Sequence, residues 1–247
     1  MNQDTYEKFL YQAKVCVEAG RSEETLDYME RIIKHKTSDL SEEERNLVSV
    51  ASKNCVSTKR AAWRSIYGIE VREKANNSKY QNLVSELKQK LEIELMQACE
   101  RMLGFIDNHL LKNSTSPESK VFYLKLKGDY FRYIAEFTLG ESHEEIAKSS
   151  LNSYQQATEA AASLKSNNPI KLGLALNYSV FYYEVLNNPI EAINIANKAF
   201  NEGITNLENI VENQYKDATN ILQLLKENIN MWSGDLQEEQ MEGAVEN

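Results

Sequence analysis

Apolar positions along the chain recur mostly at spacings of three and four residues rather than alternately, which is the pattern of amphipathic helices. Clusters of Gly, Ser, Asn and Pro interrupt this pattern and divide the chain into nine predicted helices. No interruption is long or polar enough to be an interdomain linker. The pattern therefore predicts an all-α fold of nine antiparallel helices in one domain, residues 1–234.

Several helix starts carry recognisable capping signals. Ser41 and Glu44 form the pattern of a capping box at the start of a helix predicted over residues 42–75. Each proline directly follows a Ser or Asn, which suits an N-cap followed by proline in the first turn. These prolines are Pro117, Pro169 and Pro189.

The end of the chain has a different composition from the rest. Gly234 is the expected end of the last helix, and the acidic residues beyond it have almost nothing apolar to bury. We therefore expect residues 235–247 to be a disordered acidic tail.

The charge balance limits the kinds of partner. The 247 residues carry a formal net charge of −9, which argues against nucleic acid as a partner because that needs a broad cationic surface. A local cationic pocket in such a chain can still bind one phosphate.

Cysteine usage and hydropathy bear on the compartment. Cys16, Cys55 and Cys99 are odd in number and lack C-x-x-C spacing, so buried thiols are expected rather than disulfides or a zinc site. The N-terminus lacks a signal sequence, and the longest apolar run, 180–186, is far too short for a membrane span. These features predict a cytoplasmic protein, with the nucleus as a second compartment.

One helix face gathers cations in this otherwise acidic chain. Lys53, Arg60 and Arg64 stand at i, i+7 and i+11, which places them within roughly 40° of one another around a helix. Such a stripe can receive a compact anion. From these residues alone, an ordinary solvated helix face is the simpler interpretation.

Two of the later predicted helices have apolar patterns wider than one core stripe requires. The helix predicted from 169 to 187 carries on one face Gly173, Leu176, Asn177, Val180 and Glu184. The helix predicted from about 213 to 233 carries Ile221, Leu224 and Asn228 on one face and Leu222, Leu225 and Ile229 on another. Asparagines among leucines suggest a groove whose amides hydrogen-bond an extended peptide. A two-sided core helix with paired asparagines is the alternative.

Asp129, Arg132 and Tyr133 stand at i, i+3 and i+4, so the carboxylate can orient the guanidinium beside the phenol. On spacing alone, a surface ion pair is the better interpretation of this cluster.

Five segments in one register, from about residue 6 to Trp232, closely resemble the 14-3-3 family. They are RNLVSVASKN at 45–54, KRAAWR at 59–64, VFYLKLKGDYFRY at 121–133, PIKLGLALNYSVFYYE at 169–184 and YKDAT at 215–219. The resemblance implies a cup-shaped subunit of a dimer. It also implies a phosphoserine- or phosphothreonine-binding adaptor that clamps, masks or scaffolds phosphorylated client proteins in signalling and needs no cofactor.

The resemblance also assigns roles to individual residues. The implied phosphate-binding residues are Lys53, Arg60, Arg132 and Tyr133. The implied contacts to the peptide backbone are Asn177, Glu184, Asn228 and Trp232. The implied groove wall is Gly173, Leu176, Val180, Ile221 and Leu224. Asn220 also belongs to the wall but stands where leucine is usual, so this groove should be more polar at one point.

The implied dimer surface is similarly close to the family pattern. Its matching residues are Val15, Ala19, Arg21, Glu24, Lys90 and Glu94. Arg21 could meet Glu94 of the partner subunit, and Glu24 could meet Lys90 of the partner subunit. Ser22 and Leu87 replace typical tyrosines, and Ala62 replaces a serine whose phosphorylation weakens many family dimers. The partner could be a second copy or a related subunit.

No pattern in the chain indicates an enzyme. His35, His109 and His143 are scattered and suggest no metal site, and no phosphate-cradling glycine loop or nucleophile elbow is present. The alternative to the adaptor is a helical solenoid that binds unmodified peptides, although no 34-residue period is visible. Dependence of binding on phosphate would separate the two.

Overall fold

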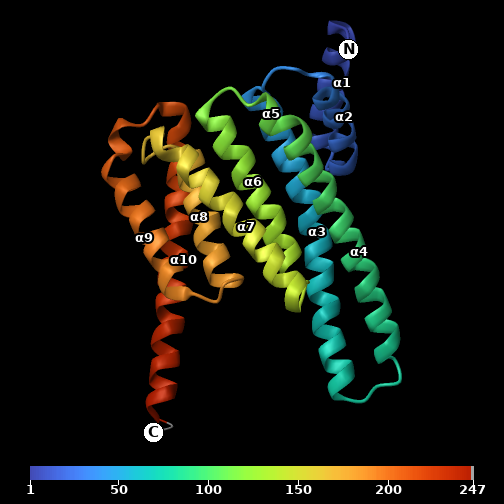
Figure 1. The fold of residues 1–247 in the computed structure, drawn as a ribbon, viewed down its shortest axis with the longest axis vertical. Coiled ribbons are helices and arrows are strands. Elements are labelled where there is room, and N and C mark those ends of the chain that lie inside the picture. The colour runs from blue at the N-terminus through green and yellow to red at the C-terminus, as the bar shows by residue number, and fades with distance from the viewer. Residues whose placement is uncertain (246–247) are drawn as a thin grey trace. The chain divides into compact units, whose positions relative to one another are not determined.

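The computed structural model describes the backbone of residues 1–245, and all side chains except those of Asn209 and residues 239–247. The chain divides into two compact units, Met1–Thr115 and Ser116–Asn247. Within the described residues every regular element is a helix, which confirms the predicted all-α class (Figure 1). That the two units form the single domain expected over residues 1–234 stays a prediction.

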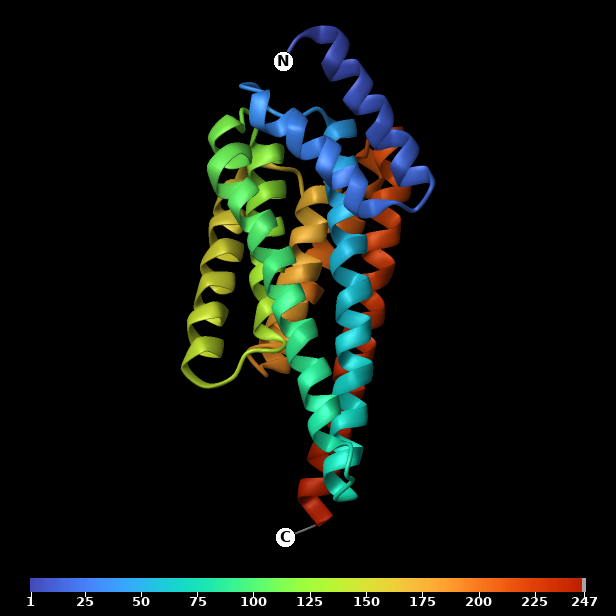
Figure 2. The same cartoon turned by 90° about the vertical axis from the view of Figure 1, so that its right-hand side faces the viewer.

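The first unit consists of four long helices. They are α1 (Gln3–Glu18), α2 (Ser22–His35), α3 (Glu42–Ala75) and α4 (Gln81–Phe105). A π-helical turn, η1 (Ile106–Leu110), and a last short helix, α5 (Leu111–Asn113), continue α4 without a break. Helices α3 and α4 run side by side along most of their length (Figure 2).

The second unit contains five long helices and two short 3₁₀ turns. The long helices are α6 (Pro117–Ala135), α7 (Gly140–Ala160), α8 (Pro169–Glu184), α9 (Pro189–Thr205) and α10 (Glu212–Val245). The 3₁₀ turns are η2 (Ala161–Ser163) and η3 (Leu207–Asn209). With α4, η1 and α5 taken as one helix, the described chain has the nine helices that the sequence predicts.

Capping residues start the helices where the sequence predicts. The Ser41 hydroxyl accepts from the backbone N–H of Glu44, whose carboxylate accepts from the backbone N–H of Ser41, so the capping box is confirmed. Each proline begins its helix directly after a side-chain cap. Those caps are Ser116, Asn168 and Asn188.

The predicted end of the last helix at Gly234 is wrong. Helix α10 continues to Val245. That residues 235–247 form a disordered acidic tail stays a prediction, and the last two of these residues lie outside the described part of the chain. No proline follows Gly234, and the next residues are mostly good helix formers such as Gln, Glu, Leu and Met. The Tyr183 hydroxyl also donates to the Asp235 carboxylate at 2.6 Å, which ties the first residue beyond Gly234 to α8.

A buried carboxylate organises the start of α3 in the first unit. Glu44 is fully buried and accepts from Lys36 Nζ at 2.5 Å, from the Ser41 backbone N–H at 2.6 Å and from the Tyr6 hydroxyl at 3.0 Å. Burial pushes the pKa of Glu44 upward, but these hydrogen bonds outweigh it and the net pKa is lowered. Burial and the neighbouring Glu44 carboxylate raise the pKa of Tyr6 to about 12.

Two glycines allow the helices of the second unit to approach closely. A Cβ on Gly128 of α6 would lie 2.8 Å from the Tyr154 ring of α7, and a Cβ on Gly203 of α9 would lie 2.9 Å from Leu172 of α8. Real Cβ atoms do not tolerate such contacts. The core between α8, α9 and α10 is a cluster of seven buried residues. They are Leu172, Ala192, Ala196, Ala218, Leu222, Leu225 and Trp232.

We predict that Glu44→Ala lowers the free energy of unfolding by about 3–5 kcal/mol, because the change leaves the Lys36 ammonium without its buried partner. Urea denaturation at neutral pH measures this loss. The matched control is Glu43→Ala, which removes an exposed ion pair with Lys14 and should cost less than about 1 kcal/mol. Equal losses in the two variants would contradict the prediction.

The same carboxylate gives a pH dependence. Because the folded-state pKa of Glu44 is lowered, its contribution is complete above the unfolded pKa of about 4.3 and is lost as pH falls through the folded value. The stability difference between wild type and Glu44→Gln should therefore shrink below about pH 4.

Candidate functional site

A buried arginine marks the candidate site in the second unit. Arg132 lies on α6 with only 8% of its surface exposed, and its Cζ lies 4.8 Å from the centre of the Tyr133 ring. Its Nη1 donates to the Glu184 carboxylate of α8 at 3.0 Å, whereas its buried Nε has no hydrogen-bond partner. Burial acts to lower the pKa of the Arg132 guanidinium, but the surrounding tyrosines and carboxylates outweigh it and raise this pKa. The cation is held in place with one donor unused.

Asp129 connects three helices beneath this arginine. Its carboxylate accepts from Lys125 Nζ at 3.0 Å on α6, from the Tyr154 hydroxyl at 2.6 Å on α7 and from the Asn177 amide at 2.9 Å on α8. Burial and the Asp129 charge raise the pKa of Tyr154 well above its usual value, so this phenol stays a donor. Because the Asn177 amide nitrogen is committed to Asp129, its carbonyl oxygen is the group that can accept from a ligand.

The predicted groove wall lies on α8 and α10. Ile221 reaches within 3.9 Å of a Cβ placed on Gly173, so the two helices pack here. Leu176, Val180 and Ile221 are half-buried against the core of this unit, whereas Leu224 is 47% exposed. Asn220 is exposed and Asn228 is half-buried on the same helix. The second apolar face of α10, with Leu222 and Leu225, is the one buried in the core.

Trp232 is buried at the far end of this wall. Its indole ring stacks on Tyr183 of α8 with the ring centres 4.9 Å apart, and its Nε1 has no hydrogen-bond partner. Buried indole N–H groups usually have an acceptor. Within the described residues this indole N–H is therefore a buried donor without an acceptor.

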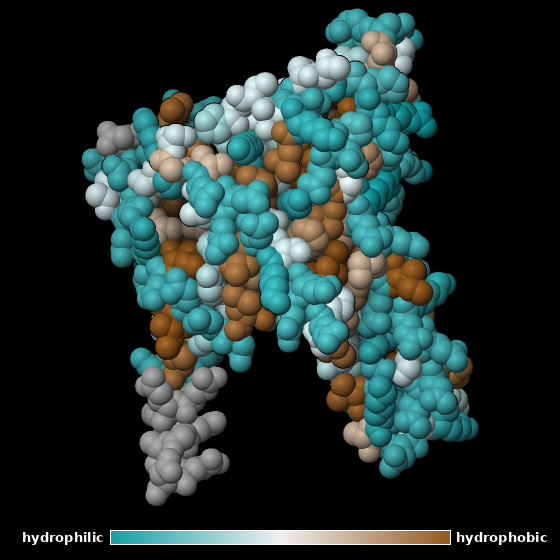
Figure 3. Space-filling view, viewed as in Figure 1, coloured by the Kyte–Doolittle hydropathy of each residue, from teal (hydrophilic) through white to brown (hydrophobic). Residues whose placement is uncertain are grey.

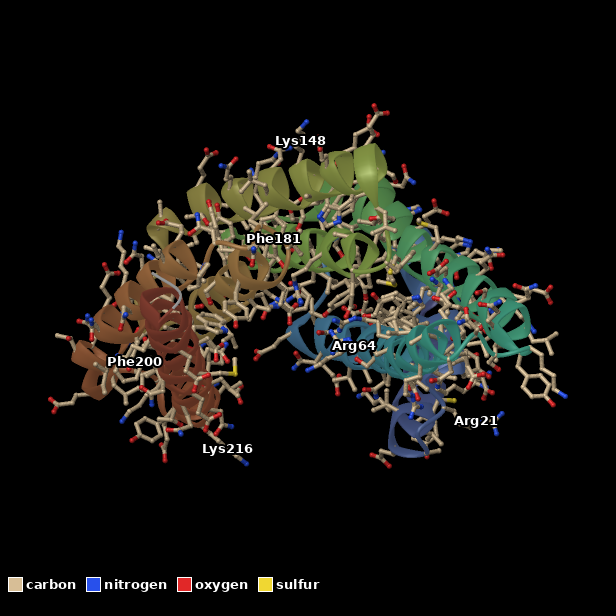
Figure 4. All side chains as sticks on the ribbon, turned by 90° about the horizontal axis from the view of Figure 1, so that it is seen from below. Arg21, Arg64, Lys148, Phe181, Phe200 and Lys216 are labelled. Atoms are coloured by element: carbon tan, nitrogen blue, oxygen red, sulfur yellow. The ribbon has the colours of Figure 1, made fainter. Side chains whose placement is uncertain are left out.

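The cationic stripe lies on α3 in the first unit. Lys53 and Arg64 are exposed and Arg60 is half-buried, and the continuous helix over Glu42–Ala75 gives them the shared face that their spacing predicts. Arg64 of this stripe is labelled in Figure 4. The structure thus brings Arg132 and Tyr133 together with Asn177 and Glu184 in one unit. Lys53 and Arg60 lie in the other unit.

The predicted dimer residues lie in the first unit, on α1 to α4 and, for Ala19 and Arg21, in the turn between α1 and α2. Val15 and Leu87 are large exposed apolar residues, with exposed fractions of 46% and 49%. Ala19, Arg21 and Lys90 are exposed, and half-buried are Ser22, Glu24, Ala62 and Glu94. Arg21 forms two hydrogen bonds with Glu24 of the same chain. The space-filling view shows apolar atoms among polar ones over α3 and α4, where Leu83 and Ile93 are also exposed (Figure 3).

Sequence reasoning missed three residues that support the site. They are Lys125 and Tyr154, which hold Asp129, and Tyr183, which stacks on Trp232. Lys125 could have been found, because it stands four residues before Asp129 on one helix face. The other two contacts join residues on different helices and leave no local signal.

Comparisons with known proteins agree with this fold. The family model of the 14-3-3 protein matches residues 12–233. The chain is 46% identical over 236 residues to 14-3-3-like protein GF14-C of Oryza sativa subsp. japonica, covering 94% of this chain and 92% of the relative. It is 47% identical over 231 residues to 14-3-3 protein 2 of Entamoeba histolytica, covering 93% and 97%. Against 14-3-3-like protein A of Glycine max it is 45% identical over 239 residues, covering 96% and 93%.

The described chain is an all-helical protein with a buried, ion-paired cation on α6. The chain belongs to the 14-3-3 family. Proteins of this family are adaptors that bind phosphorylated client proteins and form dimers, and they are not enzymes. This confirms the predicted phosphopeptide-binding adaptor, and the solenoid alternative is not favoured. Within the described residues, none of the helices combines the length and apolar character needed to cross a bilayer.

Proposed function

We propose that Lys53, Arg60, Arg132 and Tyr133 bind the phosphate of a phosphoserine or phosphothreonine in the client. The observation that carries this proposal is the buried Arg132 guanidinium, whose Nη1 is paired only with the partly exposed Glu184 carboxylate that an anion can displace. A phosphate near −2 offers three acceptor oxygens to the guanidinium forks, the ammonium and the phenol. Each charge-assisted hydrogen bond contributes about 1.5–3 kcal/mol, so an unmodified serine loses most of the binding energy.

Glu184 gives the phosphate a competitor. Its carboxylate lies 3.0 Å from Arg132 Nη1 and its side chain is 43% exposed, so it can turn away when a stronger anion arrives. We infer that the released carboxylate then accepts from the peptide backbone, together with Asn177 and Asn228. A dianion displaces this carboxylate, whereas a client carboxylate only exchanges one monoanion for another.

The client peptide would lie along the wall of α8 and α10. Leu176, Val180 and Leu224 supply apolar surface, and a contact of the peptide with the Trp232 N–H would require this buried side chain to move. The exposed amide of Asn220 makes the wall more polar than usual for the family, so residues away from the phosphate would be selected differently.

The working form would be a homodimer, or a heterodimer with a related subunit, with one groove in each protomer. Two phosphorylated sites on one client would then bind with an effective concentration of up to about millimolar for the second site. The dimer could clamp, mask or scaffold clients in signalling. We place the protein in the cytoplasm and the nucleus, where reducing conditions suit its three free cysteines, and we do not expect nucleic acid as a partner.

We predict that a labelled Arg-Ser-x-Ser-x-Pro peptide binds only when its second serine is phosphorylated, and that Arg60→Ala and Arg132→Ala each weaken binding at least tenfold. Each variant loses a charge-assisted contact to the phosphate. Fluorescence polarisation measures the affinity. The control is Lys216→Ala, which removes an exposed lysine of α10 and should leave the affinity unchanged. Equal binding of both peptide forms would contradict the pocket.

We predict that Glu184→Gln widens the preference for the phosphopeptide over the same peptide with Asp in place of phosphoserine by about two- to fivefold. Removing the carboxylate charge beside Arg132 relieves repulsion of the bound anion, and a dianion gains more from this than a monoanion. Taking the ratio of the two affinities cancels any lost backbone contact and the cost of displacing Glu184, which both peptides share. Glu227→Gln makes the same change at an exposed position of α10 and should leave the ratio as in wild type. An unchanged ratio in Glu184→Gln would show that the Glu184 charge does not act on the bound anion.

We predict that Lys90→Glu weakens the dimer and that adding Glu24→Lys restores part of the lost affinity, because the double change rebuilds the opposite charges across the interface. Sedimentation at several protein concentrations measures the dissociation constant. If the double variant is as weak as the sum of the single changes, Glu24 and Lys90 do not meet across the interface.

A further inference from the structure

A second cavity lies within the second unit, between α7, α8 and α9. Its volume is about 330 Å³, within the range of small-molecule sites. Figure 4 views the molecule from below, with Phe181 of α8 and Phe200 of α9 labelled in this unit. None of the residues assigned to phosphate, peptide or dimer contacts lines this cavity.

Small side chains on all three sides leave this space open. Ala161 of η2, directly after α7, Ala175 on α8 and Ala199 on α9 line the cavity together with the buried Leu172 and Leu174. A larger residue at any of the three alanines would fill the volume. The surface of the cavity is therefore mainly apolar, and the small size of the three alanines leaves its volume unfilled.

An aromatic ring forms one wall. Tyr178 lines the cavity and stacks with Tyr154, with the ring centres 5.3 Å apart and the planes at 27°. Tyr178 also stacks with Phe181 at 6.4 Å and 22°. These neighbours fix the ring, so it presents a rigid face to an aromatic or aliphatic ligand.

The cavity and the proposed peptide groove lie on opposite faces of α8. Lys171, Leu174, Ala175 and Tyr178 follow the i, i+3, i+4, i+7 spacing of one helix face and all line the cavity. At about 100° per residue, the groove positions 173, 176, 177, 180 and 184 centre roughly 150° away around the helix. A ligand in the cavity would not occupy the peptide groove.

The cavity mouth carries more positive than negative charge in an acidic chain. Its charged lining residues are Lys171, Lys198 and Glu202. Lys171 Nζ donates to the Leu164 carbonyl at 3.0 Å, which uses one of its three N–H groups. Lys198 is exposed, and among the described residues it forms no ion pair. Two ammonium groups beside an apolar cavity match a ligand with an apolar body and one anionic end.

We propose that this cavity binds a small amphipathic anion, an aromatic or aliphatic body with one carboxylate or sulfonate group. The body would fill the space between Ala175, Ala199 and Tyr178, and the anionic group would lie at Lys171 and Lys198. This site is independent of the phosphate pocket and of the proposed client contacts.

The test uses two matched fluorescent probes with the full chain. One is 8-anilinonaphthalene-1-sulfonate, and the other is N-phenyl-1-naphthylamine, which has the same ring system without the sulfonate. We expect the wild type to bind one equivalent of the anionic probe at least fivefold more tightly than the neutral probe. Ala199→Trp should reduce binding of both probes at least tenfold, because the indole occupies the cavity.

Lys198→Glu keeps the proposal testable if Ala199→Trp fails to fold, which circular dichroism would reveal. This charge reversal at an exposed position should abolish the preference for the anionic probe and leave the affinity for the neutral probe unchanged. Lys216→Glu makes the same change on α10 and should preserve the preference. Unchanged titrations in a folded Ala199→Trp, an equal effect of Lys198→Glu and Lys216→Glu, or no binding by the wild type would each overturn the proposal.

Discussion

Burial of the Arg132 guanidinium is the constraint on which the second unit depends. A buried cation is tolerated only where opposite charge and hydrogen-bond acceptors surround it. Here the Glu184 carboxylate supplies the direct partner, and the Asp129 carboxylate adds negative charge from one helix turn away. Asp129 is itself held from three helices, so α6, α7 and α8 are fixed together around the cation. The helices α6, α7 and α8 position the candidate site. The same helices must pack closely to compensate the charge of Arg132.

Helix α8 is the element that the groove and the second cavity share. Its groove face carries Asn177 and Glu184, which contact Asp129 and Arg132 of α6. Its opposite face carries Ala175 and Tyr178 toward α7 and α9. Close packing leaves a helix little freedom to rotate. Gly128 lets α6 and α7 approach closely, so α6, which contacts α8, is itself tightly packed. Each face of α8 is therefore presented in one orientation.

Local signals in the sequence are sufficient to predict most of the helices, but they do not predict the contacts between the helices. Ser41, Pro117 and Pro189 mark helix starts because a cap satisfies backbone groups within four residues. The end at Gly234 was predicted wrongly, because a single glycine costs a helix only about 1 kcal/mol and a tertiary contact at the next residue outweighs it. The Tyr154–Asp129 hydrogen bond joins positions 25 residues apart on separate helices, and no periodicity records such a pair.

The four cations and donors proposed for phosphate differ in how much order each must gain on binding. Arg132 is already immobilised by burial and by Glu184, so it can contribute its hydrogen bonds with little loss of side-chain entropy. Lys53 is exposed on α3 and gives up the freedom of a long side chain when it contacts an anion. Fixed geometry at Arg132 favours specificity for the tetrahedral, doubly charged phosphate, because its guanidinium fork cannot move to suit a smaller ion. A mobile ammonium at Lys53 adds electrostatic attraction but does not constrain the geometry of the bound anion. In a chain of net charge −9, this division centres phosphate binding on the residue whose geometry is fixed.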